Sequence, residues 1–150
     1  MRWSTGEAVV DRLLDQGSID RVQGAQADGE SWLERARRGL DAARIVAEAA
    51  PDSSIILAYD AARQACVALL AQQGLRPTTS GGRYAIEEAI RAQFGVTLRA
   101  FGGLRRRRNE LEYPLYPTES ASADEAAEAL QTANEIIDAA ARLLPDLGFF

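Results

Sequence analysis

The feature that most constrains the fold is the segment from Ile55 to Gln73, which is apolar on nearly every side. Asp60, Arg63 and Gln64 interrupt it, and Gly74 follows at a position where helices commonly end. A helix that lacks a polar face must be covered on all sides by other parts of the chain. The sequence therefore predicts a protein built around one central, buried helix.

The remaining segments have the spacing of helices that bury a single face. Alanine fills 28 of the 150 positions, which favours helix wherever packing does not decide. No segment alternates with a period of two for long enough to predict a strand. The predicted fold is all-α, an antiparallel helical bundle of four main helices plus short extra helices. The main helices are expected at 29–50, 55–73, 97–112 and 126–144, the short ones at 4–15 and 86–94, and loops at 75–82 and 114–122.

The chain is expected to divide into residues 1–28 and residues 29–150. The first part holds a short helix, with Ser4 and Glu7 at capping-box spacing, and a polar stretch with several glycines. We expect this stretch to act as a linker that leaves the first helix loosely attached. Residues 29–150 are expected to form the bundle.

Composition excludes several classes of protein. No uncharged apolar run approaches the roughly 20 residues of a membrane span, and the N-terminus lacks the pattern of a signal peptide. A single cysteine, Cys66, and the complete absence of His exclude a disulfide framework, zinc sites and His-dependent triads. We expect a cytoplasmic protein without membrane contact, bound metal or cofactor.

Charge is spread unevenly along the chain, although the net charge is −5. Residues 76–108 hold eight Arg and two acids, a balance of +6, whereas residues 109–150 hold one Arg and nine acids, a balance of −8. The basic segment either attracts a polyanion or neutralises the acidic C-terminal third within the fold.

Arg108 stands out within the run of four Arg. It continues an apolar stripe formed by Leu98, Phe101, Leu104 and Leu111 at helical steps. A guanidinium at a buried position costs free energy unless a carboxylate, a phosphate or a partner surface meets it. Two interpretations follow: an anion-binding residue, or a structural ion pair with an acid such as Asp60 or one on the last helix.

Arg105, Arg106 and Arg107 cannot all share a face with Arg108, because successive helical residues are about 100° apart. They are expected either to form solvated surface or to contact phosphates. The spacing also predicts intrahelical ion pairs between Arg106 and Glu110 and between Arg108 and Glu112, which stabilise a helix by only about 0.2–0.5 kcal/mol each.

The sequence Arg108-Asn-Glu-Leu-Glu-Tyr113 resembles the Arg-polar-spacer-His motif of the HEPN superfamily of small all-α proteins. The motif lies at the end of the expected helix, and Tyr113 occupies the place of the family's His. The resemblance extends over roughly residues 29–145, including Ala58 to Arg63 in the central helix and the loop from Gly74 to Thr79.

The resemblance implies a homodimer with two motifs in one cleft, often a metal-independent endoribonuclease paired with a nucleotidyltransferase in a toxin–antitoxin module. Arg108 and Asn109 would then hold the scissile phosphate of RNA. Tyr113 would occupy the position of the His that acts as the general base in the family. A phenol, with an ordinary pKa of about 10, is a poor general base at neutral pH. Glu112 or Glu110 would have to serve instead.

Three hypotheses remain open from the sequence. The first is a HEPN dimer that binds RNA or nucleotides with weak or lost cleavage. The second is an active endoribonuclease using Arg108 and Tyr113, and the third is a helical adaptor without a nucleic-acid role. The expected binding residues are Arg105, Arg106, Arg107 and Tyr116, and Leu115 and Tyr116 are expected to be exposed at a dimer interface.

Overall fold

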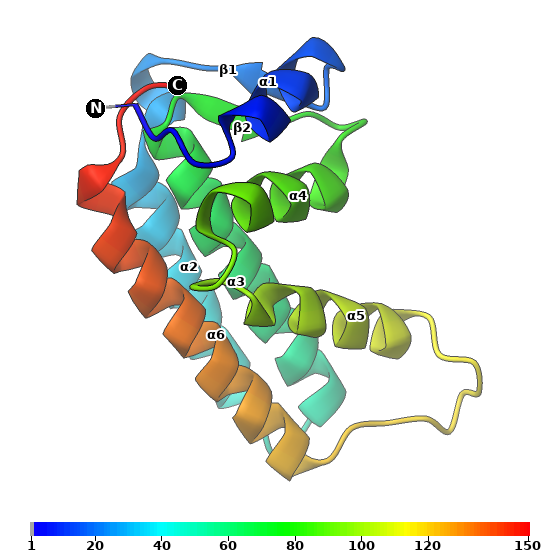
Figure 1. The fold of residues 1–150 in the computed structure, drawn as a ribbon. Helices are drawn as coiled ribbons and strands as arrows, with labels where there is room; N and C mark the ends of the chain where they lie inside the picture. The colour runs from blue at the N-terminus through cyan, green and yellow to red at the C-terminus, as the bar shows by residue number, and fades with distance from the viewer. Residues whose placement is uncertain (1) are drawn as a thin grey trace.

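Six helices form a bundle with a short antiparallel strand pair at one end in the computed structural model, which describes residues 2–150 (Figure 1). The prediction of a helical bundle is confirmed. The helices are α1 (Glu7–Asp15), α2 (Gly29–Ile45), α3 (Pro51–Gln72), α4 (Gly82–Phe94), α5 (Ala100–Glu112) and α6 (Ala123–Leu143). The strands are β1 (Ile19–Arg21) and β2 (Leu75–Pro77), and short 3-10 turns cover Gly24–Ala27 and Leu144–Asp146.

The central helix is α3, as the sequence predicts. The long helices α2 and α6 lie along it, and α4 and α5 pack across it (Figure 1). Within residues 2–150, α3 alone is long and apolar enough to span a membrane, and 72% of its apolar window is buried in the bundle. Its composition is therefore explained by its place in the core.

The junction between α2 and α3 differs from the prediction. Helix α2 ends at Ile45, and α3 already begins at Pro51. Proline is favoured in the first turn of a helix, because its fixed φ is helical and its missing N–H would be unpaired there anyway. Pro51 therefore starts α3, and the hydroxyl of the buried Ser54 donates a hydrogen bond to the carbonyl of Ala43 across the junction at 2.7 Å.

The N-terminal residues are not loosely attached, contrary to the prediction. Val10 and Leu13 of α1 are buried against α4, and Ile19 of β1 is 1% exposed. The expected capping box does not form, since α1 begins after Gly6, whose φ of 76° is left-handed, without a side-chain cap. Burial of these apolar side chains holds the segment to the bundle. The division of the chain at residue 28 stays a prediction.

The strand pair was not expected from the sequence. Ile19 pairs with Pro77 and Arg21 with Leu75, so each strand is only three residues long. Three residues are too few to show an alternating pattern, and the pairing joins segments more than 50 positions apart. This strand pairing holds in place the segment that connects α3 to α4.

Helices α4 and α5 both cross α3 and extend from the same side of the bundle, one after the other along α3 (Figure 1). Helix α5 begins at Ala100, three residues later than expected, and Thr97 lies in the preceding turn, where its N–H donates to the carbonyl of Phe94. Pro114 follows the end of α5 as predicted, and an exposed loop then leads back to α6. The sides of α4 and α5 that face each other form the candidate site.

Candidate functional site

Helix α5 buries Arg108 together with apolar side chains. Phe101 and Leu104 face the core from the same stripe, and Arg108 is 8% exposed. The prediction that this arginine occupies a buried position on an apolar stripe is confirmed. Its charge therefore needs a partner.

The guanidinium of Arg108 is only partly satisfied. Its Nη1 donates to the Oδ1 of Asn109 at 3.2 Å, and its Nη2 lies 3.8 Å from a carboxylate oxygen of Glu112. The pairing with Glu112 follows the predicted spacing, whereas Asp60 lies beside Arg63 instead, at 3.8 Å. The Nε of Arg108 is buried without an acceptor among the described residues. An unpaired buried donor costs about 1–3 kcal/mol, or more when it is charged.

A cavity of about 400 Å³ opens beside Arg108 between α4 and α5. We call it the Arg108 pocket. It is lined by Arg83, Tyr84, Arg105, Arg108, Asn109 and Tyr113. Three of these six side chains are cationic and none is a carboxylate, so the pocket suits an anion. Arg108, Asn109, Tyr113 and Arg105, predicted separately, meet here.

Arg83 and Tyr84 were missed by the sequence analysis. They stand in the first turn of α4, whose position is set by the preceding loop: the hydroxyl of Thr78 donates to the carbonyl of Gly17 at 2.8 Å and accepts from the N–H of Gly81. A side chain at position 81 would overlap the carbonyl oxygen of Ser18, so this approach requires glycine. In the sequence, these two residues are marked only by the glycine pair that directly precedes them.

Arg105 lines the pocket but is already paired with a carboxylate, and its role in binding stays a prediction. Its Nε donates to a carboxylate oxygen of Glu87 on α4, and the two side chains are only 16% and 13% exposed. Its guanidinium also lies 5.3 Å from the ring centre of Tyr84. An ion pair this well shielded from solvent keeps both side chains in place. Arg105 therefore forms part of the pocket wall, and its ion pair links α5 to α4.

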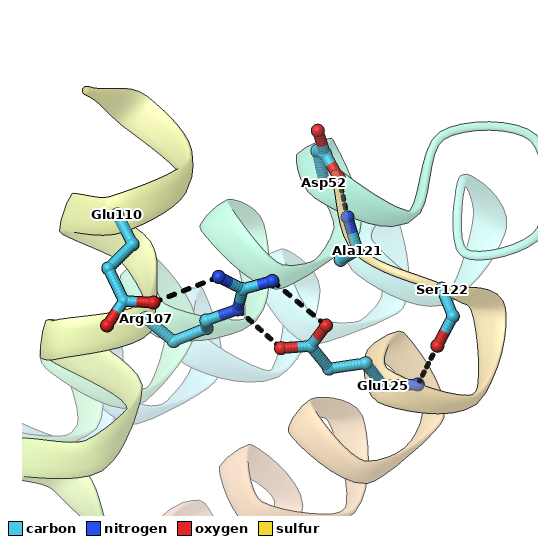
Figure 2. Close-up of polar contacts among 6 residues, drawn as sticks. All are labelled: Asp52, Arg107, Glu110, Ala121, Ser122 and Glu125. Carbon is cyan, nitrogen blue, oxygen red and sulfur yellow. Dashed lines mark hydrogen bonds and ion pairs between the residues drawn. The ribbon is translucent and has the colours of Figure 1, made fainter. Parts of the chain in front are cut away.

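Arg107, by contrast, faces away from the pocket. Figure 2 shows its guanidinium between Glu110 of α5 and Glu125 of α6. Its Nη1 donates to Glu110 at 2.9 Å and its Nη2 to Glu125 at 3.1 Å. The hydrogen bond with Glu125 raises the pKa of Arg107 above its ordinary value, so the pair stays ionised. Arg107 therefore fastens α5 to α6 and does not line the Arg108 pocket, and its role in binding stays a prediction.

The return of the chain from α5 to α6 is fixed beside this ion pair. The carboxylate of Asp52 accepts the N–H of Ala121 at 2.6 Å, and the hydroxyl of Ser122 caps α6 by accepting the N–H of Glu125 at 3.1 Å (Figure 2). The exposed loop between Tyr113 and Ser122 is thus anchored where it enters α6.

Arg106 forms no ion pair with any residue from 2 to 150, because Glu110 is taken by Arg107 at a spacing of three residues. The predicted pair between Arg106 and Glu110 is therefore wrong. The side chain of Arg106 is exposed and lies along α5 on the side that faces α4. Of the three predicted binding arginines, it is the one without a carboxylate partner.

The remaining predicted residues lie at the end of α5. Tyr113 follows the last helical residue, lines the Arg108 pocket and is 76% exposed. The side chain of Glu112 is 36% exposed at the edge of the pocket, while Glu110 points toward Arg107. Tyr116 is 62% exposed on the loop and does not line the pocket. A carboxylate at the pocket edge is therefore supplied by Glu112 alone.

Tyr59 is a fully buried side chain of α3 that packs against α5. Its ring stacks on Phe101 with the centres 5.5 Å apart, and its hydroxyl is buried without a hydrogen-bond partner among the described residues. Burial raises the pKa of Tyr59 to about 12, against the opposing effect of Arg83. Burial likewise raises the pKa of the Cys66 thiol. Both groups remain neutral at pH 7 and act as core side chains.

The chemistry open to the Arg108 pocket is anion binding. Among residues 2–150, no cluster of acidic or thiol side chains is placed to hold a metal ion. Guanidinium groups form strong, charge-assisted hydrogen bonds with phosphate, and the unpaired Nε of Arg108 is a donor already in place for such a group. Groups beside the pocket that can exchange protons are Glu112, 3.8 Å from Arg108, and the hydroxyls of the lining residues Tyr84 and Tyr113.

Comparison with known proteins gives one match. The family model described as "HEPN domain" matches residues 30–143, a range that contains α3 to α6 and the whole Arg108 pocket. No curated protein and no solved structure matches the chain significantly.

Proposed function

Because this chain belongs to the HEPN family, with three quarters of its length matched, we propose that it is a dimeric RNA- or nucleotide-binding protein with weak or lost cleavage activity. Its setting would be a toxin–antitoxin or defence module, with a nucleotidyltransferase as the partner protein. The observation that carries this proposal is the buried, incompletely paired guanidinium of Arg108 at the base of a cationic pocket.

The composition of the pocket supports phosphate as the bound group. Arg83 and Arg108 come from different helices, so a phosphate between them would receive donors from two directions. Asn109 orients Arg108 through the hydrogen bond at 3.2 Å. Tyr84 and Tyr113 offer exposed rings and hydroxyls beside these cations, which suits the sugar and base of a nucleotide.

Weak cleavage follows from the groups that surround the pocket. Attack by a ribose hydroxyl needs a group that removes its proton, and imidazole is the usual one near pH 7. The chain contains no His, and Tyr113 holds the corresponding place. The second candidate function, an active endoribonuclease, rests on Glu112, whose carboxylate lies 3.8 Å from Arg108 and would act as the base.

Removing Arg108 is expected to lower RNA affinity roughly 10- to 100-fold, since a hydrogen bond to a charged group contributes about 1.5–3 kcal/mol. Arg108→Met keeps most of the side-chain volume in the buried position and leaves no unpaired charge. Binding of a fluorescent single-stranded RNA is measured by anisotropy between about 50 and 200 mM salt, where phosphate contacts weaken as salt rises.

The matched control is Arg37→Met on the exposed face of α2, which packs against α3 and α6 away from the pocket. Equal affinity of the Arg108 and Arg37 variants, or affinity of the unmodified protein that does not change with salt, would refute phosphate binding in the pocket. The adaptor hypothesis would then be preferred.

We expect the protein to form a homodimer through the end of α5 and the loop that follows. Tyr113, Leu115 and Tyr116 are 76%, 80% and 62% exposed within four positions, next to the Arg108 pocket. Apolar surface gathered in this way is typical of interaction sites. Light scattering should give twice the chain mass, and Leu115→Asp should shift the population toward monomer. A monodisperse monomer at micromolar concentration would contradict this prediction.

A further inference from the structure

A second cavity, of about 410 Å³, lies between α4 and α5 on the other side of the ion pair between Arg105 and Glu87. We call it the Arg99 cavity. Its lining includes Glu87, Ile90, Arg91, Leu98, Arg99 and Arg106. Glu87 lines this cavity and Arg105 lines the Arg108 pocket, so the two hollows share the bridge as a common wall.

The charge of the Arg99 cavity is strongly one-sided. Arg91 comes from α4, and Arg99 and Arg106 come from the start and middle of α5. All three are exposed and none has an ion-pair partner among residues 2–150. Glu87, the single acid that lines the cavity, forms an ion pair with Arg105. Three free guanidinium groups around one hollow attract an anionic ligand with several charges.

The floor of the cavity is apolar. Ile90 and Leu98 are 1% and 3% exposed, and Phe101 is held in its stack with Tyr59. Because Phe101 is only 1% exposed, its ring offers no free face on which a base could stack. The exposed Val96 stands at the rim. A ligand in this cavity would be held by its anionic groups, with apolar contact beneath and no reading of base edges.

Arg99 and Arg106, seven positions apart, share one face of α5, whereas Arg108 lies on nearly the opposite face, because successive helical residues are about 100° apart. Arg99, Arg106 and Arg108 are spread over nine residues, or roughly 13 Å of helix axis at 1.5 Å per residue. A polyanion held at both Arg108 and Arg99 would have to span about this length and cross the bridge between Arg105 and Glu87, which separates the two hollows. This length exceeds what a single nucleotide needs.

We propose that the Arg99 cavity is a second subsite, which binds the phosphates of the same single-stranded RNA beyond the nucleotide held at Arg108. This inference rests on the proposed function of the Arg108 pocket. It adds a minimum ligand length of several nucleotides and tolerance of base sequence at the second subsite. Arg91, Arg99 and Arg106 are its binding residues.

An acidic peptide is the competing occupant, and the structure favours RNA over it. Both walls are helices, so an extended peptide finds no strand edge with which to pair. A helical peptide needs a long apolar groove, whereas here the apolar floor is short and bordered by arginines on both sides. A flexible strand with regularly spaced phosphates better suits arginines that lie in two adjoining hollows.

The test compares a dinucleotide with an octanucleotide of mixed sequence, using the full chain and the variant Arg99→Glu. An acidic residue at the start of a helix is favourable, so this variant is expected to fold. Its affinity for the octanucleotide should fall about tenfold at 50 mM salt. The slope of log affinity against log salt concentration should become shallower by about one, which corresponds to the loss of one phosphate contact. Its affinity for the dinucleotide should stay within about twofold of the unmodified protein.

Arg37→Glu is the matched control for charge, and Arg108→Met the control for the first site. Loss of affinity for both RNA lengths in Arg108→Met, with unchanged octanucleotide affinity in Arg99→Glu, would overturn the second subsite and leave the proposed function intact. No RNA binding by the unmodified protein would overturn both. Binding of a poly-glutamate peptide that depends on Arg99, without an effect on RNA, would assign the cavity to peptides and also overturn the proposal.

Discussion

Tyr113→His is expected to raise the rate of RNA cleavage by about 10²- to 10⁴-fold, the usual contribution of a placed general acid or base. Position 113 already lines the Arg108 pocket beside Asn109, so an imidazole there would adjoin the phosphate-binding group. Imidazole exchanges protons near pH 7, whereas a phenol does not. The measurement is the rate of cleavage of a labelled RNA at neutral pH in the presence of a chelator.

Two further variants test whether a faster cleavage arises from an imidazole acting in the Arg108 pocket. Adding Arg108→Met to Tyr113→His should remove the gain, since the imidazole would have no bound phosphate beside it. Tyr113→Phe should leave the low rate of the unmodified protein unchanged. Robust cleavage by the unmodified protein that is lost in Tyr113→Phe would instead favour the active endoribonuclease. RNA binding without any gain in Tyr113→His would show that the motif no longer forms a cleaving cleft.

Glu87→Ala is expected to lower the free energy of unfolding by about 3 kcal/mol. It would leave the guanidinium of Arg105, only 16% exposed, without its carboxylate, and removing one partner of a buried ion pair typically costs about 3–5 kcal/mol. The corresponding fall in Tm is roughly 6–12 °C for a chain of this length. The measurement is thermal and urea unfolding followed by circular dichroism.

The matched control is Glu110→Ala, which removes a carboxylate from Arg107 at a side chain that is 60% exposed. This change should cost less than about 1 kcal/mol, because exposed ion pairs contribute little. The double variant Glu87→Leu with Arg105→Leu should recover most of the lost stability, since it removes both charges. Equal effects of Glu87→Ala and Glu110→Ala would contradict the view that the Arg105 bridge is buried.

Much of the candidate site could be predicted from local spacing. The apolar stripe through Phe101 and Leu104 identified Arg108 as buried, because a stripe at helical steps specifies which side chains face the core. The four-residue interval also identified Glu112 as its neighbour. The family resemblance, carried by Arg108 and Asn109, agrees with the model that matches residues 30–143.

The partners of the other arginines could not be predicted in this way. Arg105 pairs with Glu87, and Arg107 pairs with Glu125, each 18 positions away on another helix. Nothing within α5 distinguishes these two side chains from Arg106, which has no such partner among residues 2–150. The choice depends on how α4 and α6 are placed around α5, which is a property of the packed bundle.

The sequence by itself determined the helices, the central place of α3 and the burial of Arg108, because each follows from apolar periodicity within one segment. Only the tertiary structure decided the strand pair of Ile19–Arg21 with Leu75–Pro77 and the approach of Arg83 to the Arg108 pocket. The same holds for the assignment of carboxylates to individual arginines. These features join residues that are distant in the chain, and their contacts are selected by the packing of whole helices, on which local spacing carries no information.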